Sequence, residues 1–178
     1  MKKILTLLVL TVLSIFFISG CHEKGNGSSE DRKTNKKIDS DSLDTAYKFK
    51  TEGELVFTDS IGRTKIKIEI EIANNGSSRQ LGLMFRKHMD NSDGMLFIFT
   101  DEEMQSFWMH ETYIPLDMIF VNKEKKIVTI HRNTQTLSDQ TYPSTAPAIY
   151  VIEVNARFCA ANNINEGDRI TFIQLAKK

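Results

Sequence analysis

The sequence has no hydrophobic run long enough to cross a membrane comfortably. Its most apolar stretch covers residues 4–18, whereas a transmembrane helix needs about 20 residues. Lys2 and Lys3 precede this stretch, and small residues follow it before Cys21. A charged start, a short apolar run and a small-residue site are the layout of a secretory signal peptide. We therefore expect residues 1–20 to be a signal peptide.

The segment Ile18-Ser19-Gly20-Cys21 resembles the lipobox of bacterial lipoproteins. The resemblance implies cleavage before Cys21, a diacylglycerol on its sulfur, and a fatty acid such as palmitate on its new amino group. It also implies an exported protein that is lipid-anchored in the bacterial cell envelope, on the periplasmic or the cell-surface side, with the membrane as partner. Two alternatives stay open: an uncleaved anchor helix, and an ordinary secretory signal that stops at a cysteine.

Cysteine is scarce, because the 178 residues contain only Cys21 and Cys159. If Cys21 carries lipid, no intramolecular disulfide is possible. Cys159 lies among small and apolar residues, whereas a reactive thiolate needs electropositive, partly exposed surroundings. We expect Cys159 to be a buried structural thiol.

The chain also has no surplus of positive charge, with 23 basic and 23 acidic residues. Removal of residues 1–20 takes away Lys2 and Lys3, which leaves 21 basic against 23 acidic residues and a formal charge of −2. Binding to nucleic acid needs a surplus of Lys and Arg on one face, so we expect no nucleic-acid partner. The four histidines show no metal-ligand spacing, so we expect no metal site and no cofactor.

Residues 21–50 consist of the expected lipidated cysteine and a run rich in Lys, Asp, Glu, Ser, Asn and Gly. This run has almost no large apolar side chains before Tyr47, so it cannot bury enough surface to offset the entropy lost on ordering. We expect a flexible tether that holds the domain off the membrane. Residues 51–178 are long enough for one globular domain with its own core, and these features are compatible with a monomer.

Short apolar stretches separated by turns predict a mainly β domain of the α+β class. In residues 65–72, isoleucines alternate with lysines and glutamates, which is typical of a half-exposed antiparallel strand. We expect a single compact, mostly antiparallel sheet with two short helices, from Ser77 or Ser78 to Lys87 and over residues 156–162. Further strands are expected over residues 53–59, 95–99, 107–112, 116–121, 127–130, 148–155 and 169–175. Residues 133–147 are expected to be a loop without structure of its own, long enough to form a lid or rim.

The segment from Ser106 to Val121, SFWMHETYIPLDMIFV, gathers aromatic bulk, a titratable ring and a carboxylate. In an extended chain, successive side chains point to opposite faces. The expected core face is Phe107, Met109, Leu116, Met118 and Phe120, and the candidate site face is Trp108, His110, Thr112 and Asp117.

Arg79, Gly82 and Arg86 would share one face of the first expected helix, because three and seven residues both return nearly to the starting angle. Two arginines around a glycine could hold a carboxylate or phosphate; alternatively, they pair with acids of the protein itself.

Glu153 and Asn155 are the last two residues on one face of the buried strand expected over residues 148–155. An unpaired buried carboxylate is costly, so Glu153 needs a partner such as Arg79 or Arg86, or it lines a polar pocket.

The domain resembles the bacterial and archaeal family catalogued as domain of unknown function 192 in five motifs: RQLGLMFR (79–86), DGMLF (93–97), FWMHETYIPLD (107–117), IYVIEVN (149–155) and GD (167–168). The resemblance implies a compact, mainly β, barrel-like domain that is often exported and has no established activity. The family usually has Lys or Arg and then Asn where this chain has His110 and Glu111, and it has glycine at the position of Arg157. These departures weigh against a mechanism that needs a permanent cation at 110, an amide at 111 or close backbone contact at 157.

Three functions stay open. In a binding module, the aromatic and polar side chains of residues 106–117, with the arginines, would form a concave patch for a small polar or anionic ligand. In a hydrolase-type enzyme, His110 would be the general base, Asp117 or Glu153 would orient it or act as acid, and Arg79 would stabilise an anion. In a structural or assembly factor, an exposed apolar patch on the same face would hold an envelope partner. We favour the binding module, because no nucleophile lies at a recognisable motif.

Overall fold

The computed structural model describes residues 48–176. The expected signal peptide, the lipidation site at Cys21 and the tether up to residue 47 lie outside the described residues. Within residues 48–176, no helix is both long and apolar enough to cross a bilayer.

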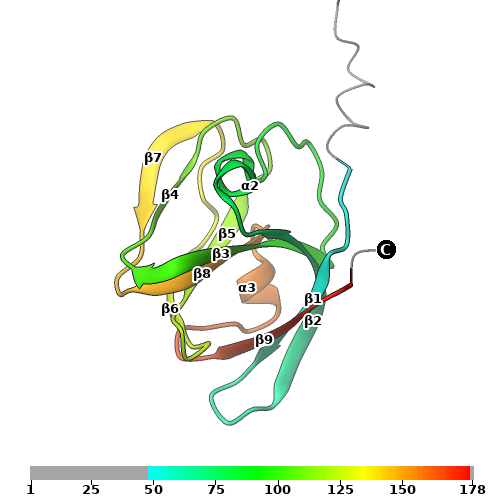
Figure 1. Cartoon of the computed structure of the whole chain (residues 1–178), viewed down its shortest axis with the longest axis vertical. Coiled ribbons are helices and arrows are strands. Elements are labelled where there is room, and N and C mark those ends of the chain that lie inside the picture. The colour runs from blue at the N-terminus through cyan, green and yellow to red at the C-terminus, as the bar shows by residue number, and fades with distance from the viewer. Residues whose placement is uncertain (1–47, 177–178) are drawn as a thin grey trace, which may run out of the picture. The chain divides into compact units, whose positions relative to one another are not determined.

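The described chain is built mainly from strands, with two short helices among them (Figure 1). In chain order, the elements are β1 (Gly53–Thr58), β2 (Thr64–Ala73), α2 (Gly76–Leu81), β3 (Asp93–Glu103), β4 (Ser106–Met109), β5 (Leu116–Val121), β6 (Ile127–His131), β7 (Ser138–Pro143), β8 (Ala148–Asn155), α3 (Phe158–Ala161) and β9 (Arg169–Gln174). The predicted fold class, mainly β with two short helices, is confirmed.

Seven strands form one large sheet in the order β6-β5-β8-β3-β2-β1-β9, and β4 pairs with β7 in a separate two-stranded ribbon. All neighbouring strands are antiparallel except β2 and β3. The two edges of the large sheet approach each other near a single bridge between Lys126 and Arg169, where the amide of Ile127 donates to the carbonyl of Asp168 at 2.8 Å. A continuous ladder does not join β6 to β9, so the sheet is strongly curved but is not a closed barrel.

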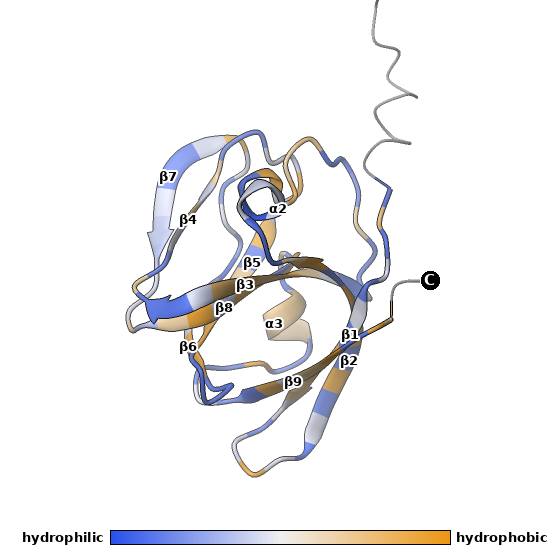
Figure 2. Cartoon of the chain, in the orientation of Figure 1, coloured by the Kyte–Doolittle hydropathy of each residue, from blue (hydrophilic) through white to orange (hydrophobic). Residues whose placement is uncertain are grey.

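The curved sheet has an apolar core on each face, and Figure 2 shows hydrophobic residues along its strands and in α3. The inner core surrounds α3, where the rings of Phe57 and Phe158 lie 5.8 Å apart. The outer core includes Phe97 and Phe120 and is covered by the turn after α2 and by the β4–β7 ribbon. Strand β5 is buried along its whole length because it contributes to both cores. Each large side chain buried in this way stabilises the fold by about 1.5–3 kcal/mol.

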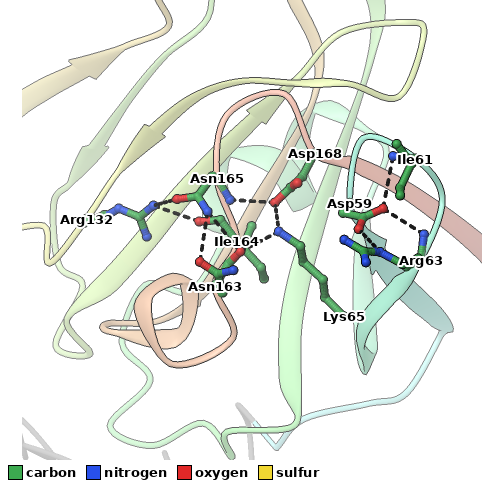
Figure 3. Close-up of polar contacts among 9 residues, drawn as sticks. All are labelled: Asp59, Ile61, Arg63, Lys65, Arg132, Asn163, Ile164, Asn165 and Asp168. Atoms are coloured by element: carbon green, nitrogen blue, oxygen red, sulfur yellow. Dashed lines mark hydrogen bonds and ion pairs between the residues drawn. The ribbon is translucent and has the colours of Figure 1, made fainter.

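A polar network fixes the turn before β9 to strand β2 (Figure 3). The Lys65 ammonium donates to the Asp168 carboxylate and to the Asn163 carbonyl, both at 2.5 Å. The same carboxylate oxygen accepts from the amide of Asn165 at 2.7 Å. These groups satisfy one another, so we assign the network a structural role.

Several sequence expectations about local structure were wrong. The first helix ends at Leu81 instead of Lys87, because Gly82 takes φ +49° and ψ −133° and stops the helical repeat. Its cap is Asn75, whose Oδ1 accepts from the amide of Ser78 at 3.0 Å, rather than Ser77 or Ser78. The expected loop over residues 133–147 contains strand β7, which pairs with β4.

Candidate functional site

A cavity of about 260 Å³ lies on the outer face of the large sheet, where α2, β3, β4 and β8 meet. Its lining consists of residues 79–84, Phe97, Phe99, residues 105–108, His110, Thr112 and Glu153. Six of the nine candidate site residues are therefore brought together here: Arg79, Gly82, Trp108, His110, Thr112 and Glu153. Arg86, Asp117 and Asn155 do not line this cavity.

Glu153 is the buried acid of the cavity. It lies on β8, opposite Met95 of β3 on one side and Met118 of β5 on the other, and its residue exposure is only 5%. Within residues 48–176 its carboxyl group has no hydrogen bond and no ion pair, although it lines the cavity. Burial raises the pKa of Glu153 to about 8, while the nearby Arg86 charge opposes the rise. At neutral pH the group is therefore mostly a neutral acid.

Arg79 brings a guanidinium group to the same cavity. Its Nη1 donates to the carbonyl of Ile98 at 3.0 Å, and its charge lies 5.2 Å from the centre of the Phe99 ring. No carboxylate of the described chain pairs with it. Because one bond to a carbonyl leaves most of its five N–H donors free, Arg79 can still bind an anion.

Arg86 has a different role from Arg79, because it lies beyond the end of α2. Its Nη2 forms an ion pair with the Glu71 carboxylate, and both side chains are almost buried. Its Nε is buried without a hydrogen-bond partner in the described chain. The expectation that an arginine pairs with an acid of the protein itself thus holds for Arg86, and the partner is Glu71 rather than Glu153.

Trp108 provides an exposed aromatic plane at the cavity, with half of its surface accessible (50%). The His110 ring stacks on it, with centroids 4.9 Å apart and an angle of 24° between the planes. Nδ1 of His110 lies 2.7 Å from Oδ1 of Asp139 on β7, and the Thr112 hydroxyl donates to the His110 carbonyl at 3.0 Å. The β4–β7 ribbon therefore positions both rings, in agreement with the predicted alternation of Phe107 and Trp108.

Gly82 lets the backbone approach the cavity wall closely. A Cβ atom at this position would lie 3.2 Å from Cζ of Phe97, and the positive φ of Gly82 is one that other residues rarely adopt. The group that approaches the backbone closely at Gly82 is therefore the protein's own Phe97 ring.

Asp117 and Asn155 are engaged in holding the scaffold together. Asp117 is completely buried and accepts from the amides of Asn133 and Cys159, both at 2.9 Å. Asn155 donates from Nδ2 to the carbonyl of Met89 at 2.7 Å. Both side chains are bonded to the scaffold, and neither lines the cavity.

The hydrogen bond by which Asp117 or Glu153 would orient His110 in a hydrolase is not made in the described residues. In residues 48–176, no hydrogen bond joins His110 to Asp117 or to Glu153; its partner is Asp139. Burial, followed by the proximity of Asp117, raises the pKa of the Cys159 thiol, and this buried thiol lies outside the cavity. The same residues contain no cluster of three or more His, Cys, Asp or Glu side chains that could hold a metal ion.

Several lining residues were not predicted as site residues. Phe97 and Phe99 belong to the strand predicted over residues 95–99, and nothing in their local pattern indicates that a cavity borders them. Gln105 lies outside every predicted strand and helix, but it is 7% exposed and lines the cavity. The partnership of His110 with Asp139 could not be found without knowing that β7 lies beside β4.

Comparison with known proteins places the domain in a family. Residues 58–172 match DUF192, described as an uncharacterized ACR family. A UPF0127 protein of Pyrococcus furiosus is 30% identical over 108 residues, which covers 60% of this chain and 88% of the relative.

Two crystal structures share the fold. One, from Sinorhizobium meliloti and described as a candidate transcription regulator, has a TM-score of 0.66 and 33% identity, covering 70% of this chain and 97% of its own. The other, a protein of unknown function from Novosphingobium aromaticivorans, has a TM-score of 0.63 and 30% identity, covering 66% and 83% respectively. Since the family match spans most of the chain, this protein belongs to the DUF192 family.

Proposed function

We propose that the domain is a binding module for a small polar or anionic ligand, held in the cavity between α2, β3, β4 and β8. The observation that carries this proposal is Glu153, a buried acid without a partner in residues 48–176 that lines the cavity. Burying a polar group without a hydrogen bond is costly, and such exceptions in folded proteins require an explanation. A bound ligand that hydrogen-bonds to Glu153 supplies one.

The remaining lining fits such a ligand. Arg79 offers free N–H donors to an anionic group, and Trp108 offers an exposed face on which a flat or apolar part can pack. The rings of Phe97 and Phe99 make the wall mainly apolar, as is common in small-molecule sites with a few polar groups for orientation.

A thermal-shift screen of metabolites against the full chain in a mild detergent tests this function. Ligands that bind in the cavity should raise the melting temperature of the wild type and have a much weaker effect on Trp108→Ala. Tyr113→Ala is the matched control, because Tyr113 is exposed to a similar degree, 45%, and does not line the cavity. A hit that stabilises Trp108→Ala as much as wild type would place its site elsewhere.

We also propose that the protein is exported and anchored by lipid at Cys21, with the cavity domain held in the cell envelope. The support is the sequence of residues 1–21, in which a charged start, a short apolar run and a small-residue site precede a cysteine. Growth with a labelled palmitate analogue should label the wild type and leave Cys21→Ala unlabelled. Equal labelling of both proteins would refute lipidation at Cys21 and would leave the proposed binding function of the cavity untouched.

A further inference from the structure

We infer that the ligand of the cavity is a small zwitterion with an apolar body, such as an α-amino acid with an apolar side chain. In this arrangement the ammonium group of the ligand binds the Glu153 carboxylate and its carboxylate binds Arg79. The inference rests on the proposed function and adds the chemical class of the ligand.

The cavity wall carries one basic and one acidic side chain, Arg79 and Glu153. Arg79 and Glu153 carry opposite charges when both are ionised and line the same cavity. Yet they form no ion pair with each other, and neither pairs with another charged side chain within residues 48–176. Charged side chains with restricted access to water are usually paired. A ligand with a negative and a positive end satisfies both groups together.

The protonation state of Glu153 depends on the charge of the bound ligand. Near pH 7 the carboxyl group of Glu153 holds its proton, because burial raises the pKa of Glu153 to about 8. An anionic ligand does not favour loss of this proton. An added ammonium group favours the ionised carboxylate, since an opposite charge within a few ångströms lowers the pKa of an acid. Binding then releases the proton of the Glu153 carboxyl group to solvent, and the ligand ammonium keeps its own protons. Zwitterion binding at neutral pH should therefore be accompanied by proton release.

The rest of the cavity wall is largely aromatic. Phe97, Phe99, Phe107 and Trp108 line the cavity, and none of these side chains offers a charged group. The cavity volume of about 260 Å³ lies just below the range of about 300–1,000 Å³ for drug-sized sites. A compact body such as a branched aliphatic or single aromatic side chain suits this space.

Isothermal titration of the full chain in a mild detergent tests the inference with two matched sets of probes. The first set is L-leucine, 4-methylpentanoate, which lacks the amine, and 3-methylbutylamine, which lacks the carboxylate. The second set is L-phenylalanine, 3-phenylpropanoate and 2-phenylethylamine. We expect at least one amino acid to bind more tightly than both of its analogues by about tenfold or more, the effect of one hydrogen bond to a charged group.

Three variants assign the two ends of the ligand. Glu153→Gln should lose the preference for the amino acid over the amine-free analogue, and Arg79→Gln should lose the preference over the carboxylate-free analogue. Glu103→Gln is the control, because Glu103 is exposed and lies outside the cavity. Titrations at pH 7 in two buffers with different ionisation enthalpies should show proton release for wild type and none for Glu153→Gln.

The outcomes separate the two proposals. If the amine-free acids bind as tightly as the amino acids, and bind Glu153→Gln equally well, the zwitterion inference is overturned while the binding module stands. If none of the six probes binds, the zwitterion inference is again overturned, and the metabolite screen with Trp108→Ala then decides the binding function separately.

Discussion

Replacing Glu153 by glutamine should make the folded domain more stable at neutral and alkaline pH and change its stability little near pH 5. Burial raises the pKa of this carboxyl group from an ordinary value of 4.5 to about 8. Between these two values, the folded chain holds a proton that the unfolded chain has lost, so the stability of the wild type falls as pH rises. Glutamine has nearly the same shape as glutamate and does not titrate, so the stability of the variant does not fall with pH in this way.

The size of the effect follows from the pKa values. Each pH unit inside this window is worth about 1.4 kcal/mol. At pH 7 the cost to the wild type is therefore about 3 kcal/mol, and it approaches about 5 kcal/mol above pH 8. With only 5% of Glu153 exposed, water screens this cost little. This change is large compared with the free energy of unfolding of a typical domain, which is about 5–15 kcal/mol.

Urea unfolding of the full chain in a mild detergent measures the effect, with Trp108 as the single tryptophan reporter. The difference in unfolding free energy between Glu153→Gln and wild type should grow steadily from pH 5 to pH 8. Glu103→Gln, which alters an exposed acid, should show no such growth. If the curves of Glu153→Gln and wild type stay parallel over this range, Glu153 is not a buried acid with a raised pKa, and the reasoning fails.

Three further substitutions test the scaffold around the site by the same unfolding measurement. Arg86→Met should lower the unfolding free energy by about 3–5 kcal/mol, because it leaves the Glu71 carboxylate buried without its charged partner; a loss below 1 kcal/mol would contradict the pairing. Asp117→Asn should cost about 1–3 kcal/mol, since a single amide oxygen cannot replace both carboxylate oxygens as acceptors, and unchanged stability would argue against its scaffold role. Gly82→Ala should cost about 1–3 kcal/mol through its positive φ and the contact of its methyl group with Phe97, and a stabilised variant would disprove the strained position.

Much of the fold could be predicted, because the strands carry clear local signals. The alternation in residues 65–72 corresponds to β2, and the apolar run of residues 148–155 corresponds to β8. The period of two also distinguished Phe107, which is half-buried against the outer core, from the exposed Trp108 on β4.

The site was predicted less completely, because faces of different strands cannot be related without the topology. Asp117 shares its face with Ile119 and Val121, which belong to the inner core, whereas Trp108 lies on β4 of the separate ribbon over the outer face. Arg86 was placed on a helix with Arg79 by a period of 3.6, but the helix stops at Leu81. Positive φ at a glycine depends on tertiary contacts, so periodicity alone does not reveal that stop.

The most direct test of the binding site is the position at which a ligand acts. Amide ¹H–¹⁵N spectra of the full chain in detergent should be recorded with and without the best ligand from the screen. The account predicts that the largest shifts cluster at residues 79–84, 105–110 and 153, around the cavity. Shifts confined to the surroundings of Asp117 and Asn155, with the cavity amides unchanged, would contradict it.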